Sequence, residues 1–273
     1  GLAVRFYTLP PDGVDWPWLF TTMTRYKVLF KRRFEHAIID SGVEQFFNHG
    51  RLKDYPEWYL REYKRRARYL SQIFGDRVWV VVPDYPDDYR PGQTYENGLD
   101  NVDKTVARIE EFTAIDGVEW LPVIQSRYED TFSFIESCHR VRELLGRYPR
   151  LAIGTVCKAR KLKWIVWCCL YARQTFPGSW LHAFGLTLSA LPRLKGRLDS
   201  FDSMVWSYHQ LRPYDLEHKS WRTRAVIDSF DSTAWTFPRR AGLPSAKSLE
   251  AKRRYFMAYV ARVREILGVE EWP

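Results

Sequence analysis

One stretch of the sequence decides the class of fold: the apolar run Val78-Trp-Val-Val-Val-Pro-Asp84, which ends in a carboxylate. A strand that is apolar throughout, rather than at alternate positions, is typical of a sheet covered on both faces. The residues before it, 55–74, carry Tyr63, Ala67 and Leu70 at the spacing of one helix face. A helix followed by a doubly buried strand predicts a unit of a parallel α/β sheet.

The same alternation runs along the rest of the chain. Further candidate strands are residues 4–8, 36–40, 120–125, 151–155 and 181–185 and, less clearly, 198–201 and 226–229. Further helical patterns occupy residues 102–112, 130–145, 159–175 and 245–267. Repeated strand–helix units in a chain of 273 residues favour a closed (β/α)8 barrel of the TIM type over an open sheet with a second domain. We therefore expect a single domain over residues 1–273, irregular at its start, with helix 245–267 packing on it.

Composition narrows the class of protein and its partners. The chain is 45% hydrophobic, which excludes disorder for most of its length. Its longest apolar run, 164–172, is too short to cross a membrane, and because no apolar segment precedes Pro10 we expect no signal peptide. With four cysteines and no disulfide framework, the expected compartment is the cytoplasm, that of a host if a phage or virus encodes the chain. A net charge of +9 with many aromatic residues is compatible with a nucleic-acid partner or with a solvated basic surface over a Trp-rich core.

Polar residues follow most of the predicted strands, at the end where parallel barrels carry their active sites. They are Asp40-Ser-Gly42, Asp84, Gln125, Gly154-Thr155, His182 with Gly185, Asp202-Ser203 and Asp231-Ser232. Each aspartate alone is explained equally well as a turn former or a helix cap. As a set they predict a site rich in carboxylates. His182 is either a structural hydrogen-bonding residue or part of that site.

Five of these segments, in order, resemble the tRNA-guanine transglycosylase superfamily (queuine and archaeosine tRNA-ribosyltransferases), and more closely its DNA-modifying branch that inserts 7-deazaguanine bases. They are Ile38-Ile-Asp-Ser-Gly42 with Gln45-Phe46, Val80-Val-Val-Pro-Asp84, Pro122-Val-Ile-Gln125, Leu151-Ala-Ile-Gly154, and His182-Ala-Phe-Gly185 followed by Asp199-Ser-Phe-Asp-Ser203. The match covers about residues 36 to 206. It implies a barrel that exchanges guanine for a 7-deazaguanine base through a covalent glycosyl intermediate.

The resemblance also implies a role for each matching residue. Asp202 would be the nucleophile at C1′, and Asp40 the general acid and base. Asp84 would accept hydrogen bonds from a guanine-like base, while Gln125 and the Gly154 amide would donate to its O6. The remaining base-binding positions are Phe184, which would stack on the base, and Ser41, Gly42, Thr155 and Gly185.

Physical chemistry is consistent with these roles. A carboxylate stabilises an oxocarbenium-like transition state and divides a base exchange into two easier steps. The guanine edge offers two donors and one acceptor, which require a carboxylate beside an amide donor. A base must leave its stack before its C1′ is reached, so a basic, aromatic rim is expected. We assign to that rim five cations: Lys158, Arg160, Lys161, Arg239 and Arg240.

The sequence also departs from the family pattern. The second glycine of the Asp-Ser-Gly-Gly motif is Val43, and Glu44 replaces the stacking aromatic residue. The zinc-binding cysteine motif of the tRNA enzymes is absent, so we expect no zinc subdomain, no metal and no cofactor, and DNA rather than tRNA as the substrate. A second Asp-Ser-Phe-Asp-Ser, at 228–232, makes Asp231 the fallback nucleophile. A tRNA enzyme lacking the zinc subdomain, and a non-catalytic barrel that binds nucleic acid or a base, remain as alternatives. The oligomeric state is left open.

Overall fold

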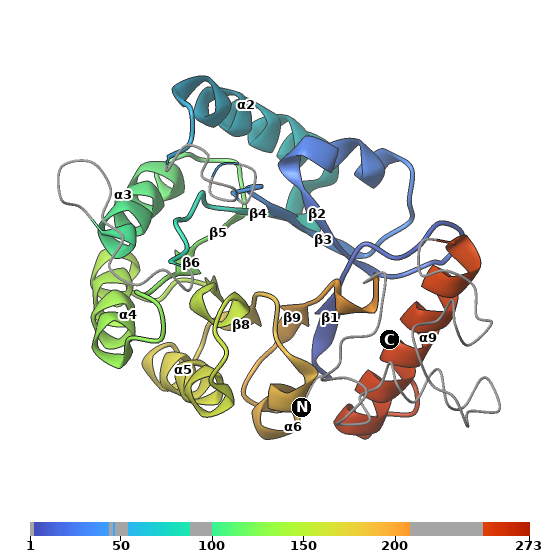
Figure 1. Cartoon of the computed structure of the whole chain (residues 1–273). Helices are drawn as coiled ribbons and strands as arrows, with labels where there is room; N and C mark the ends of the chain where they lie inside the picture. Colours follow the sequence, from blue (N-terminus) through green and yellow to red (C-terminus); the bar gives the residue numbers. More distant parts are fainter. Residues whose placement is uncertain (1–2, 44–45, 47–53, 88–99, 208–247) are drawn as a thin grey trace.

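A computed structural model describes residues 3–43, 46, 54–87, 100–207 and 248–273. Its strands lie at the centre and its helices outside them (Figure 1). The strands are β1 (Arg5–Tyr7), β2 (Trp18–Thr22), β3 (His36–Asp40), β4 (Val78–Val81), β5 (Trp120–Leu121), β6 (Val123–Ile124), β7 (Arg150–Ile153), β8 (Trp180–Ala183) and β9 (Ser200–Asp202). They form two sheets, ordered β1-β9-β8-β7-β6 and β2-β3-β4-β5, and every pairing is parallel. The chain is therefore an α/β protein, as the alternation of elements predicts.

The edges of the two sheets lie side by side at two places. Strands β5 and β6 follow one another with only Pro122 between them, and each pairs with a different sheet. At the other junction Thr8 forms a parallel bridge to Leu19, where the Thr8 amide donates to the Trp18 carbonyl over 3.1 Å and the Phe20 amide donates to the Thr8 carbonyl over 3.0 Å.

The helices occupy the connections between strands. They are α2 (Glu57–Phe74), α3 (Asn101–Thr113), α4 (Thr131–Leu145), α5 (Leu162–Thr175), the short α6 (Leu191–Leu194) and α9 (Leu249–Leu267). Single 3-10 turns lie at η3 (Gly75–Arg77), η5 (Thr155–Cys157), η6 (Leu188–Ala190) and η7 (Val205–Ser207), and a longer 3-10 segment, η1 (Met23–Phe30), follows β2. The predicted helices are confirmed with shifted ends. The predicted helix 159–175 begins only at Leu162, since the residues after β7 form a 3-10 turn.

Side-chain caps fix where three of the helices begin. The Asp100 carboxylate accepts from the Asp103 amide, Asp130 accepts from Ser133, and Ser248 accepts from Ala251. Each cap satisfies an amide that the first helical turn leaves without a partner. The cap at Ser248 explains why the last helix starts later than the predicted residue 245.

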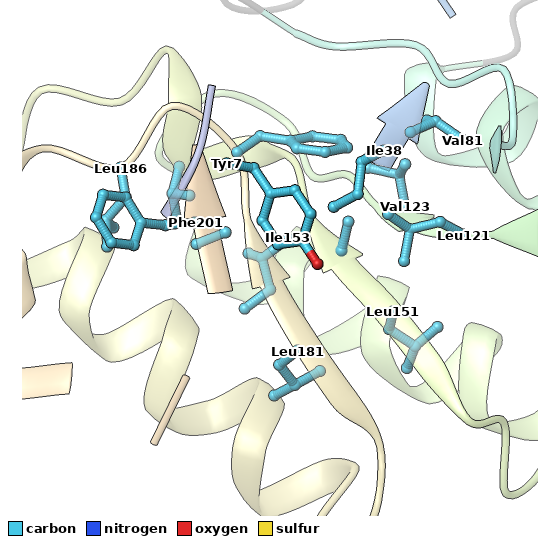
Figure 2. Close-up of a cluster of buried hydrophobic side chains, with 14 of the residues drawn as sticks. Tyr7, Ile38, Val81, Leu121, Val123, Leu151, Ile153, Leu181, Leu186 and Phe201 are labelled. Atoms are coloured by element: carbon cyan, nitrogen blue, oxygen red, sulfur yellow. The ribbon is translucent and has the colours of Figure 1, made fainter. Parts of the chain in front are cut away.

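The strands carry the core on both of their sides. Val80 and Val81 are both fully buried, and Ile38, Val123 and Ile153 meet Tyr7 in the same interior (Figure 2). This confirms that continuous apolar strands are covered on both faces. Helix α9 lies beside β1 (Figure 1), and its Tyr259 ring packs on Phe6 at 4.9 Å between ring centroids.

The sequence did not predict β2. It reads Trp-Leu-Phe-Thr-Thr directly after Pro17, in a region treated as an irregular start. The predicted strand 226–229 lies outside the described residues. Among the helices that the structure describes, none is both long and apolar enough to cross a membrane.

Candidate functional site

The carboxylate of Asp202 is held at the end of β9 by donors on both of its oxygens. His182 Nε2 lies 2.7 Å from Oδ2, and the Gly185 amide donates to Oδ1 over 3.2 Å. Gly185 has a φ of +53°, and a Cβ there would lie 2.5 Å from the Cys157 sulfur, so the turn needs glycine. The Asp202 side chain keeps 13% of its surface exposed. It is thus a fixed carboxylate that retains access to solvent.

Aromatic rings surround this carboxylate's histidine partner. The Phe20 ring from β2 stacks on His182 with an interplanar angle of 9°, and the Phe184 edge approaches His182 at 5.3 Å between ring centroids. Phe184 is itself buried. Stacking of Phe184 on a base stays a prediction. Phe20 is a neighbour that sequence reasoning missed, because β2 was missed.

A second carboxylate, Asp84, lies after β4. Gln125 Nε2 donates to Asp84 Oδ2 over 2.7 Å, joining the ends of β4 and β6. The side-chain oxygen of Gln125, Oε1, is buried and has no hydrogen-bond partner. Burial raises the pKa of Asp84 to about 6, even though the hydrogen bond from Gln125 opposes the shift. The structure thus brings together two residues that the sequence assigned to base recognition.

Ser41 and two tyrosines complete the surroundings of Asp84. The Ser41 hydroxyl lies 3.5 Å from Asp84 Oδ1 and 3.0 Å from the Tyr55 hydroxyl. Tyr55 donates to the Asp84 carbonyl over 2.7 Å, and Tyr59 donates to the Ser41 carbonyl. Neither tyrosine was predicted as a site residue, because contacts between residues distant in the sequence leave no spacing signal.

Asp40 ends β3, half-buried, opposite Thr22 of β2. Burial and then the charges of Asp84 and Asp40 raise the pKa of Tyr55 well above its usual range, which places both carboxylates within electrostatic reach of that hydroxyl. Gly42 follows with a φ of +72°, in the turn that leads away from the strand. Asp40, Ser41 and Asp84 therefore lie in one region, at the carboxyl ends of neighbouring strands.

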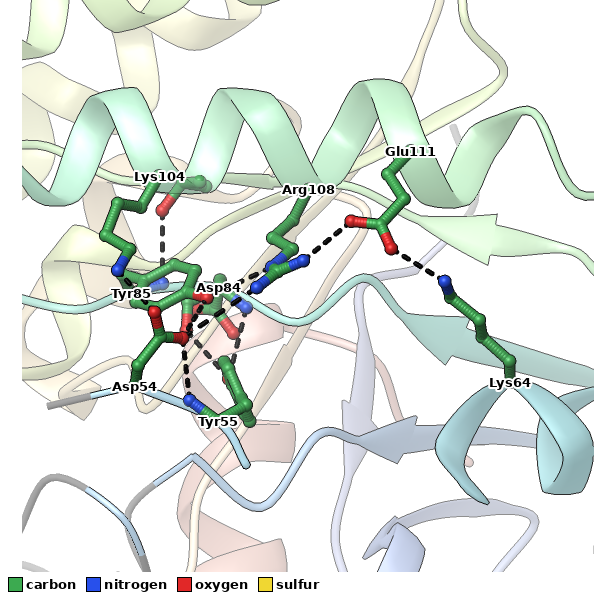
Figure 3. Close-up of polar contacts among 9 residues, drawn as sticks. Asp54, Tyr55, Lys64, Asp84, Tyr85, Lys104, Arg108 and Glu111 are labelled. Carbon is green, nitrogen blue, oxygen red and sulfur yellow. Dashed lines mark hydrogen bonds and ion pairs between the residues drawn. The ribbon is translucent and has the colours of Figure 1, made fainter. Parts of the chain in front are cut away.

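A charged network supports this region from the side (Figure 3). The Tyr85 hydroxyl donates to Asp54 Oδ1 over 2.5 Å and accepts from Arg108 Nε over 3.0 Å, while Lys104 pairs with Asp54 Oδ2. Burial opposes ionisation of Asp54, yet the bonds from Lys104 and Tyr85 dominate and lower its pKa. Because Asp54 also accepts from the Tyr55 amide over 2.7 Å, the network fixes the residue that contacts Asp84.

One predicted backbone contact does not match the structure. The Gly154 amide donates to the Ile124 carbonyl over 2.9 Å, as part of the sheet, and is not free for a base. A Cβ on Gly154 would lie 2.4 Å from Gln125 Nε2, so this glycine instead makes room for the glutamine. The Gly185 amide donates to Asp202, and contact of Gly185 with a base stays a prediction. Thr155 is buried, with its hydroxyl 2.6 Å from that of Ser126, and its contact with a base stays a prediction.

The predicted cations after β7 lie beside a glutamate. Glu129, at a φ of +48°, accepts from the amides of Arg160 and Lys161 and pairs with the Lys161 ammonium at 3.5 Å. The glutamate thus occupies the backbone amides that precede α5. The side chains of Arg160 and Lys161 are exposed, and that of Lys158 is half-buried. Nearby, Phe132 at the start of α4 is 83% exposed.

Some predicted residues lie outside the part of the chain that the structure describes. They are Asp231, Arg239 and Arg240. Within the described part, no group of three or more histidine, cysteine or acidic residues could hold a metal ion. None of the four cysteines, all of which lie in the described part of the chain, forms a disulfide, and Cys138, Cys168 and Cys169 are buried.

Comparison with known proteins finds neither a protein-family model nor a curated protein sequence that matches this chain. The motif resemblance and the geometry of the two carboxylate sites are therefore the basis for any functional conclusion.

Proposed function

We propose that the chain is a transglycosylase that exchanges guanine in DNA for a 7-deazaguanine base. One observation carries the proposal: two differently held carboxylates follow the carboxyl ends of the strands. Asp202 receives donors on both oxygens and stays partly exposed, whereas Asp84 is buried beside an amide. Such a pair divides the chemistry into one carboxylate that attacks and one that recognises a base.

In the first proposed step, a carboxylate oxygen of Asp202 attacks C1′ of a deoxyguanosine. The new O–C1′ bond forms as the C1′–N9 bond breaks, and the departing guanine takes a proton from Asp40. The incoming 7-deazaguanine then loses its N9 proton to Asp40, and N9 displaces Asp202 from C1′. Asp40 gives and regains one proton, so the cycle closes without a cofactor.

Asp84 and Gln125 are the proposed base readers. An ionised Asp84 accepts from N1–H and from the exocyclic amine of the base, and the second hydrogen of the Gln125 amide remains available for O6. The same edge is present in guanine and in 7-deazaguanine, which suits an enzyme that binds both in turn. Ser41 and Tyr55 keep Asp84 in place.

We also propose that the two sheets are parts of one closed (β/α)8 barrel. The bridge between Thr8 and Leu19 supports closure on one side. On the other side, β5 and β6 act as a single strand interrupted by Pro122, whose missing N–H explains the break. Closure would direct the ends of β3, β4, β6 and β9 toward one axis, in keeping with a shared site for their polar residues.

The proposed DNA contact is the rim beside α4 and α5, which we call the α4–α5 rim and define by Phe132, Lys158, Arg160 and Lys161. The exposed cations Arg160 and Lys161 match the charge of phosphates, and the exposed Phe132 ring suits stacking on an unpaired base. Because Glu129 occupies the backbone amides of the α5 start, phosphate contacts would come from side chains.

Nucleoside analysis tests the proposal against its alternatives. Cells that express the chain are supplied with the 7-deazaguanine precursor, and hydrolysed DNA and tRNA are analysed by mass spectrometry, with Asp202→Asn as the control. A 7-deazaguanine deoxynucleoside that depends on Asp202 supports the proposal. The modified nucleoside in tRNA alone would favour the tRNA enzyme. Base binding without exchange would favour a non-catalytic barrel. Four cysteines without a disulfide suit the proposed cytoplasmic compartment.

A further inference from the structure

His182 lies in a chain of hydrogen bonds in which the direction of each bond can be deduced. The Trp180 indole N–H, which can only donate, lies 2.8 Å from the Ser200 hydroxyl oxygen. That oxygen is 2.7 Å from His182 Nδ1, and His182 Nε2 is 2.7 Å from Asp202 Oδ2. Ser200 and His182 are both fully buried, so no water can replace a missing partner.

Only one arrangement of protons satisfies all four groups. Ser200 accepts from Trp180 and must then place its own hydrogen on an acceptor, because a buried hydroxyl without one is costly. The acceptor in reach is His182 Nδ1, which must therefore be unprotonated. The imidazole proton is then on Nε2, where it is donated to Asp202 Oδ2.

We infer that His182 is a neutral imidazole with its proton fixed on Nε2, and that the chain Trp180–Ser200–His182 positions the Asp202 carboxylate as a nucleophile. The positioning role rests on the proposed function, whereas the proton placement does not. With the Gly185 amide on Oδ1, each carboxylate oxygen receives one donor and keeps lone pairs free for attack.

This arrangement separates the role of His182 from that of Asp40. A neutral imidazole that already donates its only proton to Asp202 has no proton to give to a departing base. His182 is therefore a positioning residue, and the proton needed by the leaving guanine has to come from another group, which in the proposed reaction is Asp40. Replacing the histidine should lower turnover without changing base affinity, because Asp84 and Gln125 belong to different strands.

NMR tests the proton placement directly. The full chain is labelled with 15N-histidine, and long-range proton–nitrogen correlations are recorded at pH 7.5, with the signals of His182 assigned by their loss in His182→Gln. We expect a protonated Nε2 and an unprotonated, hydrogen-bonded Nδ1, and a shift of the Nδ1 signal in Ser200→Ala. A proton on Nδ1, or on both nitrogens, would overturn the inference.

Kinetics tests the positioning role. His182→Ala should lower kcat for exchange about 10- to 100-fold, the effect of one hydrogen bond to a charged group, and Ser200→Ala, which removes a bond to a neutral imidazole, about 2- to 10-fold. Base Kd should stay unchanged, and His182→Gln, which keeps an N–H donor, should recover part of the rate. Ser137→Ala, a buried serine in α4, is the control for loss of a hydroxyl.

The two tests separate the inference from the proposed function. An unchanged kcat in Ser200→Ala and in a folded His182→Ala would overturn the positioning role. If the wild-type chain performs no exchange, the proposed function fails and the positioning role with it, while the NMR result still decides where the imidazole proton lies.

Discussion

Replacing Asp84 by asparagine should stabilise the protein while it weakens base binding. The carboxyl is buried, and its pKa is raised to about 6 because burial disfavours the charged form. At neutral pH the folded protein therefore carries a charge that costs free energy. An asparagine keeps an acceptor for Gln125 Nε2 and turns its N–H2 toward the Ser41 hydroxyl, so it removes the charge without leaving the glutamine unpaired.

The size of this stability cost follows from the difference between the pKa of Asp84 in the folded and unfolded states. A carboxyl whose pKa rises on folding from 3.8 to about 6 costs about 3 kcal/mol of stability once the pH exceeds both values. Between about pH 4 and pH 6 the folded state binds more protons at Asp84 than the unfolded state, so the free energy of unfolding decreases as the pH rises. The stability of the wild type relative to Asp84→Asn should therefore fall across that window, and it should be level above it.

Urea unfolding followed by tryptophan fluorescence at several pH values between 4 and 7.5 measures this difference. Asp116→Asn, which removes an exposed carboxylate, is the matched control and should show little pH-dependent difference. Calorimetry at pH 7.5 should show guanine affinity reduced by about 1–3 kcal/mol in Asp84→Asn. A variant less stable than the wild type at pH 7.5, or a stability gap that does not change with pH, would refute the reasoning about burial.

Three further predictions concern packing, charge and the DNA contact. Gly154→Ala should displace Gln125, cost about 1–3 kcal/mol in urea unfolding and weaken base binding, whereas Gly178→Ala, with open space around it, should leave both unchanged. Asp54→Asn should lower the free energy of unfolding by about 0.5–1 kcal/mol at pH 7, a value discounted for the partial exposure of Asp54. This loss should vanish in acid, because the wild-type carboxyl then takes up a proton, and a loss that does not depend on pH would contradict the lowered pKa. Phe132→Ala should weaken single-stranded DNA binding about 5- to 100-fold in fluorescence anisotropy with base affinity unchanged, and equal DNA affinity would exclude Phe132 from the interface.

The periodic parts of the fold could be predicted from the sequence. Strand β3 occurs at the predicted residues 36–40, because its apolar run ends at Asp40 and turns at Gly42. Helix α2 begins two residues later than expected, after Pro56. Strand β2 was missed because Trp18-Leu-Phe-Thr-Thr22 is short and starts directly after a proline, a pattern as common in loops as in strands.

The candidate site was predictable as a set of residues but not as a set of contacts. Asp84 and Gln125 were assigned to one site. The hydrogen bond between their side chains joins the two sheets, since Asp84 follows β4 in one sheet and Gln125 follows β6 in the other, and the sequence does not show that division. The Gly154 amide was assigned to a base although the sheet already uses it, because a spacing pattern does not show which backbone amides the strands pair. The role of His182 was left undecided because its hydrogen-bond partners, Ser200 and Asp202, come from another strand, β9, and no spacing pattern reveals them.

The identity of the nucleophile is the central claim, and trapping the covalent intermediate tests it most directly. The enzyme is incubated with DNA and a base analogue that occupies the guanine site, denatured, digested and sequenced. We predict that the sugar adduct lies on the peptide 198–206, at Asp202, and that Asp202→Asn forms no adduct while it binds guanine as the wild type does. An adduct on the peptide 224–235, at Asp231, or an adduct that persists in Asp202→Asn, would contradict the account.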